Sequence, residues 1–139
     1  MDGINTKHIF QGVVAIAGSL FTYLYGGWTA LIQILLAFVV VDYITGLISA
    51  GANGELSSKV GFRGIAKKVF IFILVAVGHL VYMALGANSI IQDAVCYFYM
   101  ANELLSILEN AGKIGLPIPD ILKNAVKTLQ GKEHEDTPG

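Results

Sequence analysis

Residues 29–50 read TALIQILLAFVVVDYITGLISA and contain a single charged side chain, Asp42. A helix rises about 1.5 Å per residue, so this run is about 33 Å long and matches a hydrocarbon core of about 30 Å. Inside lipid only helices and closed barrels satisfy their own backbone, and the run does not alternate as a barrel strand would. It therefore predicts a membrane-spanning helix.

Three more apolar segments flank this one, at about residues 9–25, 69–86 and 89–108, and the last is the most polar. The whole chain is 55% hydrophobic and 14% charged, whereas soluble domains carry roughly 25% charged residues. Its mean hydropathy is +0.66. A soluble protein of this size could not bury so much apolar surface. We expect an all-α membrane protein with about four transmembrane helices.

The connections divide the chain into a transmembrane domain, 1–110, and a cytoplasmic tail, 111–139. Tight turns are predicted at Gly26-Gly27 and near residues 86–88. Between them lies the one substantial loop, 51–68, which carries four basic residues: Lys59, Arg63, Lys67 and Lys68. We interpret these four as the basic loop residues that determine the orientation of the chain in the membrane.

The tail begins with glycines and prolines that break the fourth helix. Apolar residues at helical spacing then predict a short amphipathic helix at about 120–130. The charged residues 132–139 are expected to be disordered.

The basic residues predict the orientation in the membrane. Cytoplasmic loops are enriched in Lys and Arg, so the 51–68 loop should be cytoplasmic. With four spans, both termini and every basic residue lie in the cytoplasm. With three spans, the lysine-bearing tail would lie outside, so four spans are preferred. A cleaved signal peptide is not expected, because no cleavage site leads into a polar mature domain. The predicted location is a membrane crossed several times, and the resemblance described below implies the bacterial cytoplasmic membrane.

Ionisable residues interrupt the apolar segments at Asp42 and His79. A charge at the bilayer centre costs at least about 2.5 kcal/mol, so such residues face a partner or water. They could form a proton or ion path, or they could make hydrogen bonds that fix helix packing. The sequence leaves both interpretations open.

The fourth segment has polar residues along one side and apolar residues along much of the other. The polar side is formed by Gln92, Asp93, Asn102, Glu103, Ser106, Glu109 and Asn110. A four-helix monomer has little room to satisfy so many polar groups, which favours a homo-oligomer around this side. Asp93, Asn102, Glu103, Ser106 and Glu109 join Asp42 and His79 as candidate pore, gating or interhelical residues.

The sequence lacks the residue patterns of an enzyme. His8, His79 and His134 are far apart in the chain, and no HExxH, GxSxG or phosphate-loop motif occurs. The single cysteine, Cys96, can form no intrachain disulfide or cysteine-based metal cluster. The net charge of -1 gives no attraction to nucleic acid. We expect no catalytic residues, no cofactor and no metal.

Four groups of motifs carry a resemblance to a known family. They are DYITGL at 42–47, SSK with GIAKK at 57–59 and 64–68, NELLSILEN at 102–110, and GLPIP at 115–119. In this order the sequence resembles the phage-lysis and toxin-secretion holins of Gram-positive bacteria and their phages.

The resemblance implies a function that composition does not. Holins oligomerise in the cytoplasmic membrane into lesions that collapse the membrane potential and release an endolysin or a toxin. The implied partners are the lipid bilayer, other copies of the chain, and a cell-wall hydrolase or toxin. Two alternatives stay open: a small ion or proton channel or transporter subunit using Asp42 and His79, and a membrane scaffold that recruits a soluble partner.

Overall fold

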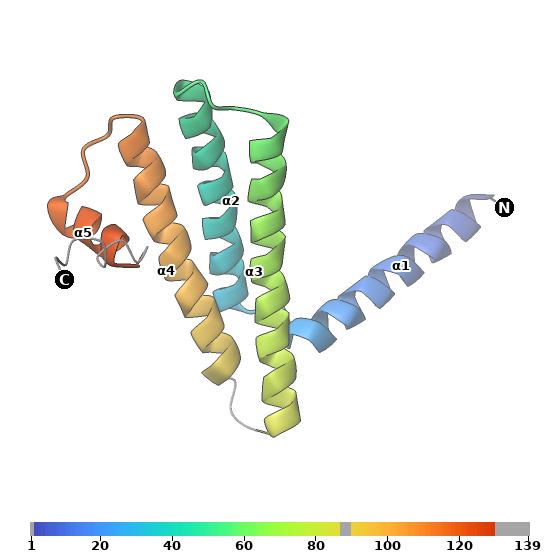
Figure 1. Ribbon diagram of the computed structural model, residues 1–139. Coiled ribbons are helices and arrows are strands. Elements are labelled where there is room, and N and C mark those ends of the chain that lie inside the picture. Colours follow the sequence, from blue (N-terminus) through green and yellow to red (C-terminus); the bar gives the residue numbers. More distant parts are fainter. Residues whose placement is uncertain (1, 87–89, 130–139) are drawn as a thin grey trace.

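The computed structural model describes residues 2–86 and 90–129, and this part of the chain contains helices and no strands (Figure 1). The expected all-α fold is confirmed. The helices are α1 (Asp2–Tyr25), α2 (Ala30–Ala52), α3 (Ser58–Leu85), α4 (Ile90–Lys113) and α5 (Asp120–Leu129).

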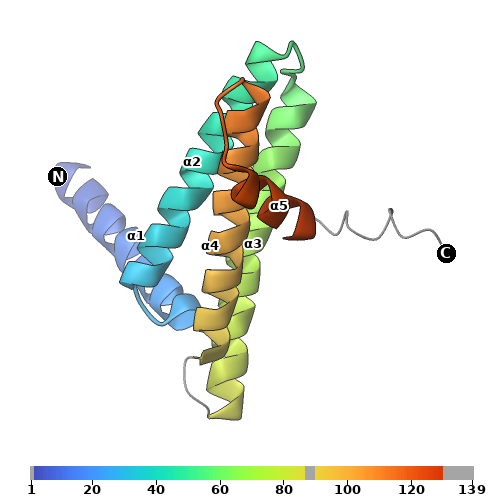
Figure 2. The same cartoon turned by 90° about the vertical axis from the view of Figure 1, so that its left-hand side faces the viewer.

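Helices α2, α3 and α4 lie side by side and form the body of the molecule (Figures 1 and 2). Their shared core is small and consists of Ile32, Leu35, Val39, Ile71, Val75 and Cys96. Cys96 is therefore a buried apolar contact of α4. This packing joins α4 to both of the more apolar helices.

Among the described residues, three helices are long and apolar enough to cross a membrane: Asn5–Tyr25 within α1, then α2 and α3. Helix α4 has 24 residues, which is long enough, but its polar side chains keep it out of this group. Its membrane-spanning character is therefore not established by length and composition.

Helix α3 begins eleven residues earlier than the apolar segment predicted, at Ser58 instead of residue 69. The Ser57 hydroxyl caps it by accepting a hydrogen bond from the Val60 amide at 3.2 Å. The expected loop at 51–68 is thus wrong for most of its length, because residues 58–68 form the first turns of α3. The loop prediction relied on glycines and charges, both of which an exposed capped helix tolerates.

Helix α1 also begins earlier than expected, at Asp2 instead of residue 9. It projects from the bundle at an angle, and the Gly26-Gly27 turn joins its C-terminal end to α2 (Figure 1). Helix α5 lies at 120–129, close to the expected 120–130. The predicted turn near 86–88 falls only partly on described residues, with Gly86 as the left-handed C-cap of α3. Residues 87, 88 and 132–139 lie outside the described part.

Candidate functional site

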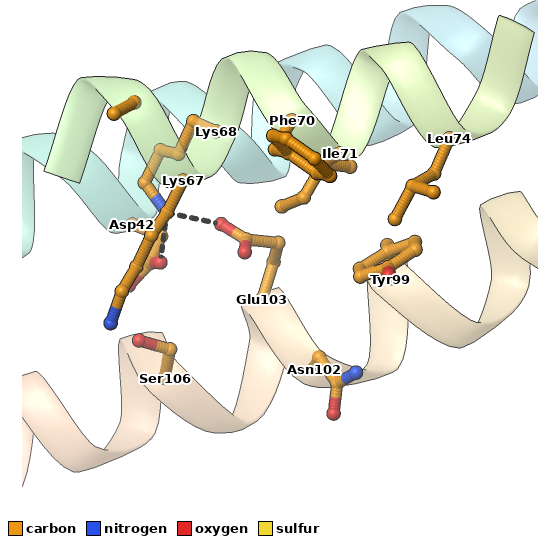
Figure 3. Close-up of a pocket in the computed structure, with 11 residues that line it drawn as sticks. Asp42, Lys67, Lys68, Phe70, Ile71, Leu74, Tyr99, Asn102, Glu103 and Ser106 are labelled. Carbon is orange, nitrogen blue, oxygen red and sulfur yellow. Dashed lines mark hydrogen bonds and ion pairs between the residues drawn. The ribbon is translucent and has the colours of Figure 1, made fainter. Parts of the chain in front are cut away.

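The candidate site is an ion cluster that joins the three bundle helices through Asp42, Lys68 and Glu103 (Figure 3). The Lys68 ammonium of α3 donates to Asp42 Oδ2 of α2 at 2.5 Å and to Glu103 Oε2 of α4 at 2.7 Å. Asp42 and Glu103 are buried, and the Lys68 side chain is 15% exposed. One lysine therefore holds two carboxylates from two different helices.

Asn110 extends this cluster by about two turns of α4 toward its C-terminal end. Its Nδ2 donates to Asp42 Oδ1 and to Thr45 Oγ1, both at 3.0 Å. Asn110 is buried, and its amide also reaches the Asp42 carbonyl oxygen at 3.3 Å. Both oxygens of the Asp42 carboxylate thus have a donor, one from α3 and one from α4.

The charges of the cluster do not cancel when all three groups are ionised. Two carboxylates and one ammonium leave one negative charge in a mostly apolar bundle. Burying charges is costly unless each is paired, and removing one partner of a buried pair typically costs about 3–5 kcal/mol. Each helix therefore depends on the other two to keep its charged residue buried.

A pocket of about 580 Å³ opens beside the cluster between α3 and α4 (Figure 3). Polar residues line one end of it, including Asn102 and Ser106, while Phe70, Leu74 and Tyr99 line the rest. The carboxylates at this pocket are already bound to Lys68. Within the described residues, no three His, Cys, Asp or Glu side chains are grouped so that they could hold a metal ion.

A second polar cluster lies at the end of the bundle where the α1–α2 turn meets α3 and α4. Gln92 Nε2 of α4 donates to the Tyr25 carbonyl oxygen at 2.7 Å, and its Oε1 lies 3.2 Å from His79 Nδ1 of α3. Because an amide oxygen can only accept, Nδ1 carries the proton in this pair. This cluster fixes the end of α1 on the bundle.

The candidate residues from the sequence therefore separate into groups. Asp42 and Glu103 meet through Lys68, whereas His79 belongs to the second cluster. Among the described residues, Asp42, Glu103 and His79 therefore do not form one continuous row of ionisable groups. Of the remaining candidates, Asn102 and Ser106 line the pocket beside the ion cluster, Asp93 lines one near His79, and Glu109 pairs with Lys113 at 3.4 Å.

The four basic residues near the start of α3 lie in two different environments. Lys59, Arg63 and Lys67 are exposed along the first turns of α3. Lys68, interpreted from the sequence as one of four equivalent topology residues, instead points into the bundle (Figure 3). Sequence reasoning missed this partner. The available signal was its place as the last charged residue before the apolar run of α3.

The fold and the site together define a small helical membrane protein whose most polar helix is bound into the bundle by buried charges. A family model identifies it further: the chain belongs to the bacteriophage holin family, whose model matches residues 19–131. The resemblance noted in the sequence is confirmed.

Relatives of the chain match over most of their length. An uncharacterized protein of Listeria monocytogenes is 49% identical over 119 residues, which cover 86% of this chain and 85% of the relative. An uncharacterized Clostridium perfringens protein is 39% identical over 128 residues, 91% and 96% of the two chains. A probable holin of Bacillus phage phi105 is 30% identical over 115 residues, 83% and 84% of the two chains. No solved structure gives a significant match.

Proposed function

We propose that the protein is a holin that oligomerises in the bacterial cytoplasmic membrane and forms lesions, which dissipate the membrane potential and release a cell-wall hydrolase or a toxin. The observation that carries the proposal is the polar side of α4, a helix that packs against the apolar helices α2 and α3. Three of its polar residues, Gln92, Glu103 and Asn110, are buried against partners on other elements. Membership of the bacteriophage holin family also supports this function.

We propose that α4 has two states. In the single copy, Gln92, Glu103 and Asn110 on the polar side of α4 bind residues of the other helices, which lowers the cost of placing α4 in lipid. In an assembly, the same side of α4 can face water instead. Lysis would then begin when α4 exchanges its bonds within the bundle for contact with water and with neighbouring copies.

We further propose that α4 crosses the membrane, which makes residues 1–110 a four-span domain with both termini in the cytoplasm. Lys59, Arg63 and Lys67 at the exposed start of α3 favour the cytoplasmic side for that end of the bundle. The tail 111–139, with α5, then lies on the same side. The ion cluster lies further along the bundle, because Lys68 is ten residues, about 15 Å, from the start of α3.

The test is induced expression in a bacterium carrying a potential-sensitive dye and a cytoplasmic cell-wall hydrolase. We expect the potential to stay normal while the protein accumulates, and then to collapse abruptly as the hydrolase escapes. A gradual selective flux without release of the hydrolase would favour a channel subunit. High accumulation with normal potential and viability would overturn the proposal.

A further inference from the structure

We propose that Glu103 binds a proton while α4 lies within the bundle, and that it releases this proton to water when α4 becomes part of a lesion. The proton site itself is argued from the ion cluster. Its consequence for lysis rests on the proposed function, because only a lesion brings the polar side of α4 into contact with water. Opening of the lesion then depends on the pH of the cytoplasm.

The ion cluster contains one more negative group than it can neutralise. Asp42 and Glu103 are each 6% exposed, and they share the Lys68 ammonium, which lies 2.5 Å from Asp42 Oδ2 and 2.7 Å from Glu103 Oε2. A buried charge without a partner of opposite sign is strongly unfavourable, and such groups usually take the neutral form instead. One bound proton makes the cluster neutral.

The contact between the two carboxyl groups also requires a proton. Asp42 and Glu103 lie within hydrogen-bonding reach of each other. Ionised carboxylates only accept hydrogen bonds, so two of them cannot form one, whereas a protonated carboxyl group has an O–H donor. The contact is therefore favourable when one of the two groups carries a proton and donates it to the other.

The distribution of hydrogen-bond donors assigns the proton to Glu103. Asp42 has a donor at each carboxylate oxygen, Lys68 Nζ at Oδ2 and Asn110 Nδ2 at Oδ1. The hydrogen bonds of the described residues give Glu103 a donor at Oε2 alone. Since donors stabilise the ionised form of a carboxyl group, Asp42 stays ionised and Glu103 takes the proton.

The other ionisable groups around Glu103 leave this charge balance unchanged. Lys67 of α3 and Tyr99 of α4 line the same pocket. Lys67 is exposed, and its side chain extends away from Glu103 (Figure 3). Tyrosine is neutral at physiological pH. The proton is therefore shared within the cluster of Asp42, Lys68 and Glu103.

The sign of the pH dependence follows from the protons bound in the two states. In the bundle Glu103 holds a proton, whereas in a lesion it faces water, where glutamate is ionised at neutral pH. The bundle binds one more proton per copy, so rising pH favours the lesion by up to about tenfold per pH unit for each copy. An alkaline cytoplasm should therefore bring the collapse of the membrane potential forward, and an acidic one should delay it.

Infrared spectroscopy tests the proton site directly, on protein at low density in liposomes that retain an entrapped dye. At neutral pH we expect the carbonyl band of a protonated carboxyl group, which isotope-labelled glutamate shifts and labelled aspartate does not. Glu103→Gln should remove this band. Asp42→Asn should remove it too, because one carboxylate and one ammonium then balance. The control Glu55→Gln, at an exposed position, should keep it. Absence of the band in the parent protein, or a shift with labelled aspartate, would overturn the proposal.

The timing of lysis gives a second readout, in cells whose cytoplasmic pH is set by a permeant weak acid or base. At equal expression, the parent and Glu55→Gln should collapse the potential several-fold earlier at alkaline than at acidic pH. Glu103→Gln should show no such difference, and an equal pH dependence in this variant would refute the link to lysis. If the infrared band is present but the potential never collapses, the proton site stands and the holin function fails. If the potential collapses and the hydrolase escapes without the band, the holin function stands and the proton site is wrong.

Discussion

At the scale of single residues, adjacent lysines of α3 should contribute very differently to stability. Lys68→Met leaves the carboxylates of Asp42 and Glu103 buried without their cation. We expect a loss of about 3–5 kcal/mol in the free energy of unfolding. Lys67→Met is the matched control, since Lys67 is exposed and its replacement should change stability by less than about 0.5 kcal/mol.

Thermal unfolding of both purified variants in detergent measures this difference. Equal midpoints for Lys68→Met and Lys67→Met would show that the ion cluster does not hold the bundle together. A restored midpoint in a triple variant that also carries Asp42→Asn and Glu103→Gln would identify the unpaired charges as the cause.

Gly26, in the α1–α2 turn, should not tolerate a side chain, because there is no room for one. Gly26 has a φ of +78°, and a Cβ there would lie 2.8 Å from Cε1 of His79. Gly26→Ala should therefore be destabilising by at least the roughly 1–3 kcal/mol of a strained backbone. Gly12→Ala, in open space within α1, should be neutral or slightly stabilising. The two unfolding midpoints in detergent decide this, and a Gly26→Ala midpoint as high as that of Gly12→Ala would contradict it.

At the scale of elements, the early start of α3 should depend on its cap. Ser57→Ala removes the side-chain acceptor for the Val60 amide and should cost about 0.5–2 kcal/mol. Ser58→Ala, at the next position inside the helix, should have little effect. Hydrogen exchange at residues 58–63 measures the difference, and unchanged protection in Ser57→Ala would argue against a capped helix there.

The elements that hydropathy predicts best are those made of continuous apolar residues. The run at 29–50 indicates α2 within two residues of its observed ends. The first eleven residues of α3 do not read as part of the apolar helix, because glycines and basic residues interrupt their apolar side chains Val60, Phe62 and Ile65. Such a segment is helical through its cap and its continuity with the apolar turns that follow.

The site was only partly predictable for a different reason. Unusual charges in apolar segments identify Asp42 and Glu103 from the sequence alone. Their partner Lys68 was not predictable, because pairing depends on how α2, α3 and α4 pack and not on spacing within one helix. Asn110 belonged to the polar side of α4, but its hydrogen bonds to Asp42 and Thr45 likewise cross between helices.

At the scale of the whole molecule, the polar side of α4 should set the timing of lysis. Glu103→Leu removes a buried bond to Lys68 and a polar group from the side proposed to face water. We expect it to delay or block collapse of the membrane potential at equal expression. Glu55→Leu is the control, because Glu55 is exposed between α2 and α3, away from the polar side of α4. Equal collapse times for the two variants would remove α4 from the proposed lesion.

The most direct test of the central claim, that α4 crosses the membrane within the bundle, is the sidedness of the chain after α4. Single cysteines at Lys59 and Lys123 in a Cys96→Ala background can be labelled by a membrane-impermeant maleimide in intact cells and in inverted vesicles. A four-span protein predicts labelling of both positions in inverted vesicles only. Labelling of Lys123→Cys in intact cells, with Lys59→Cys still protected, would contradict the account and show that α4 does not cross the membrane.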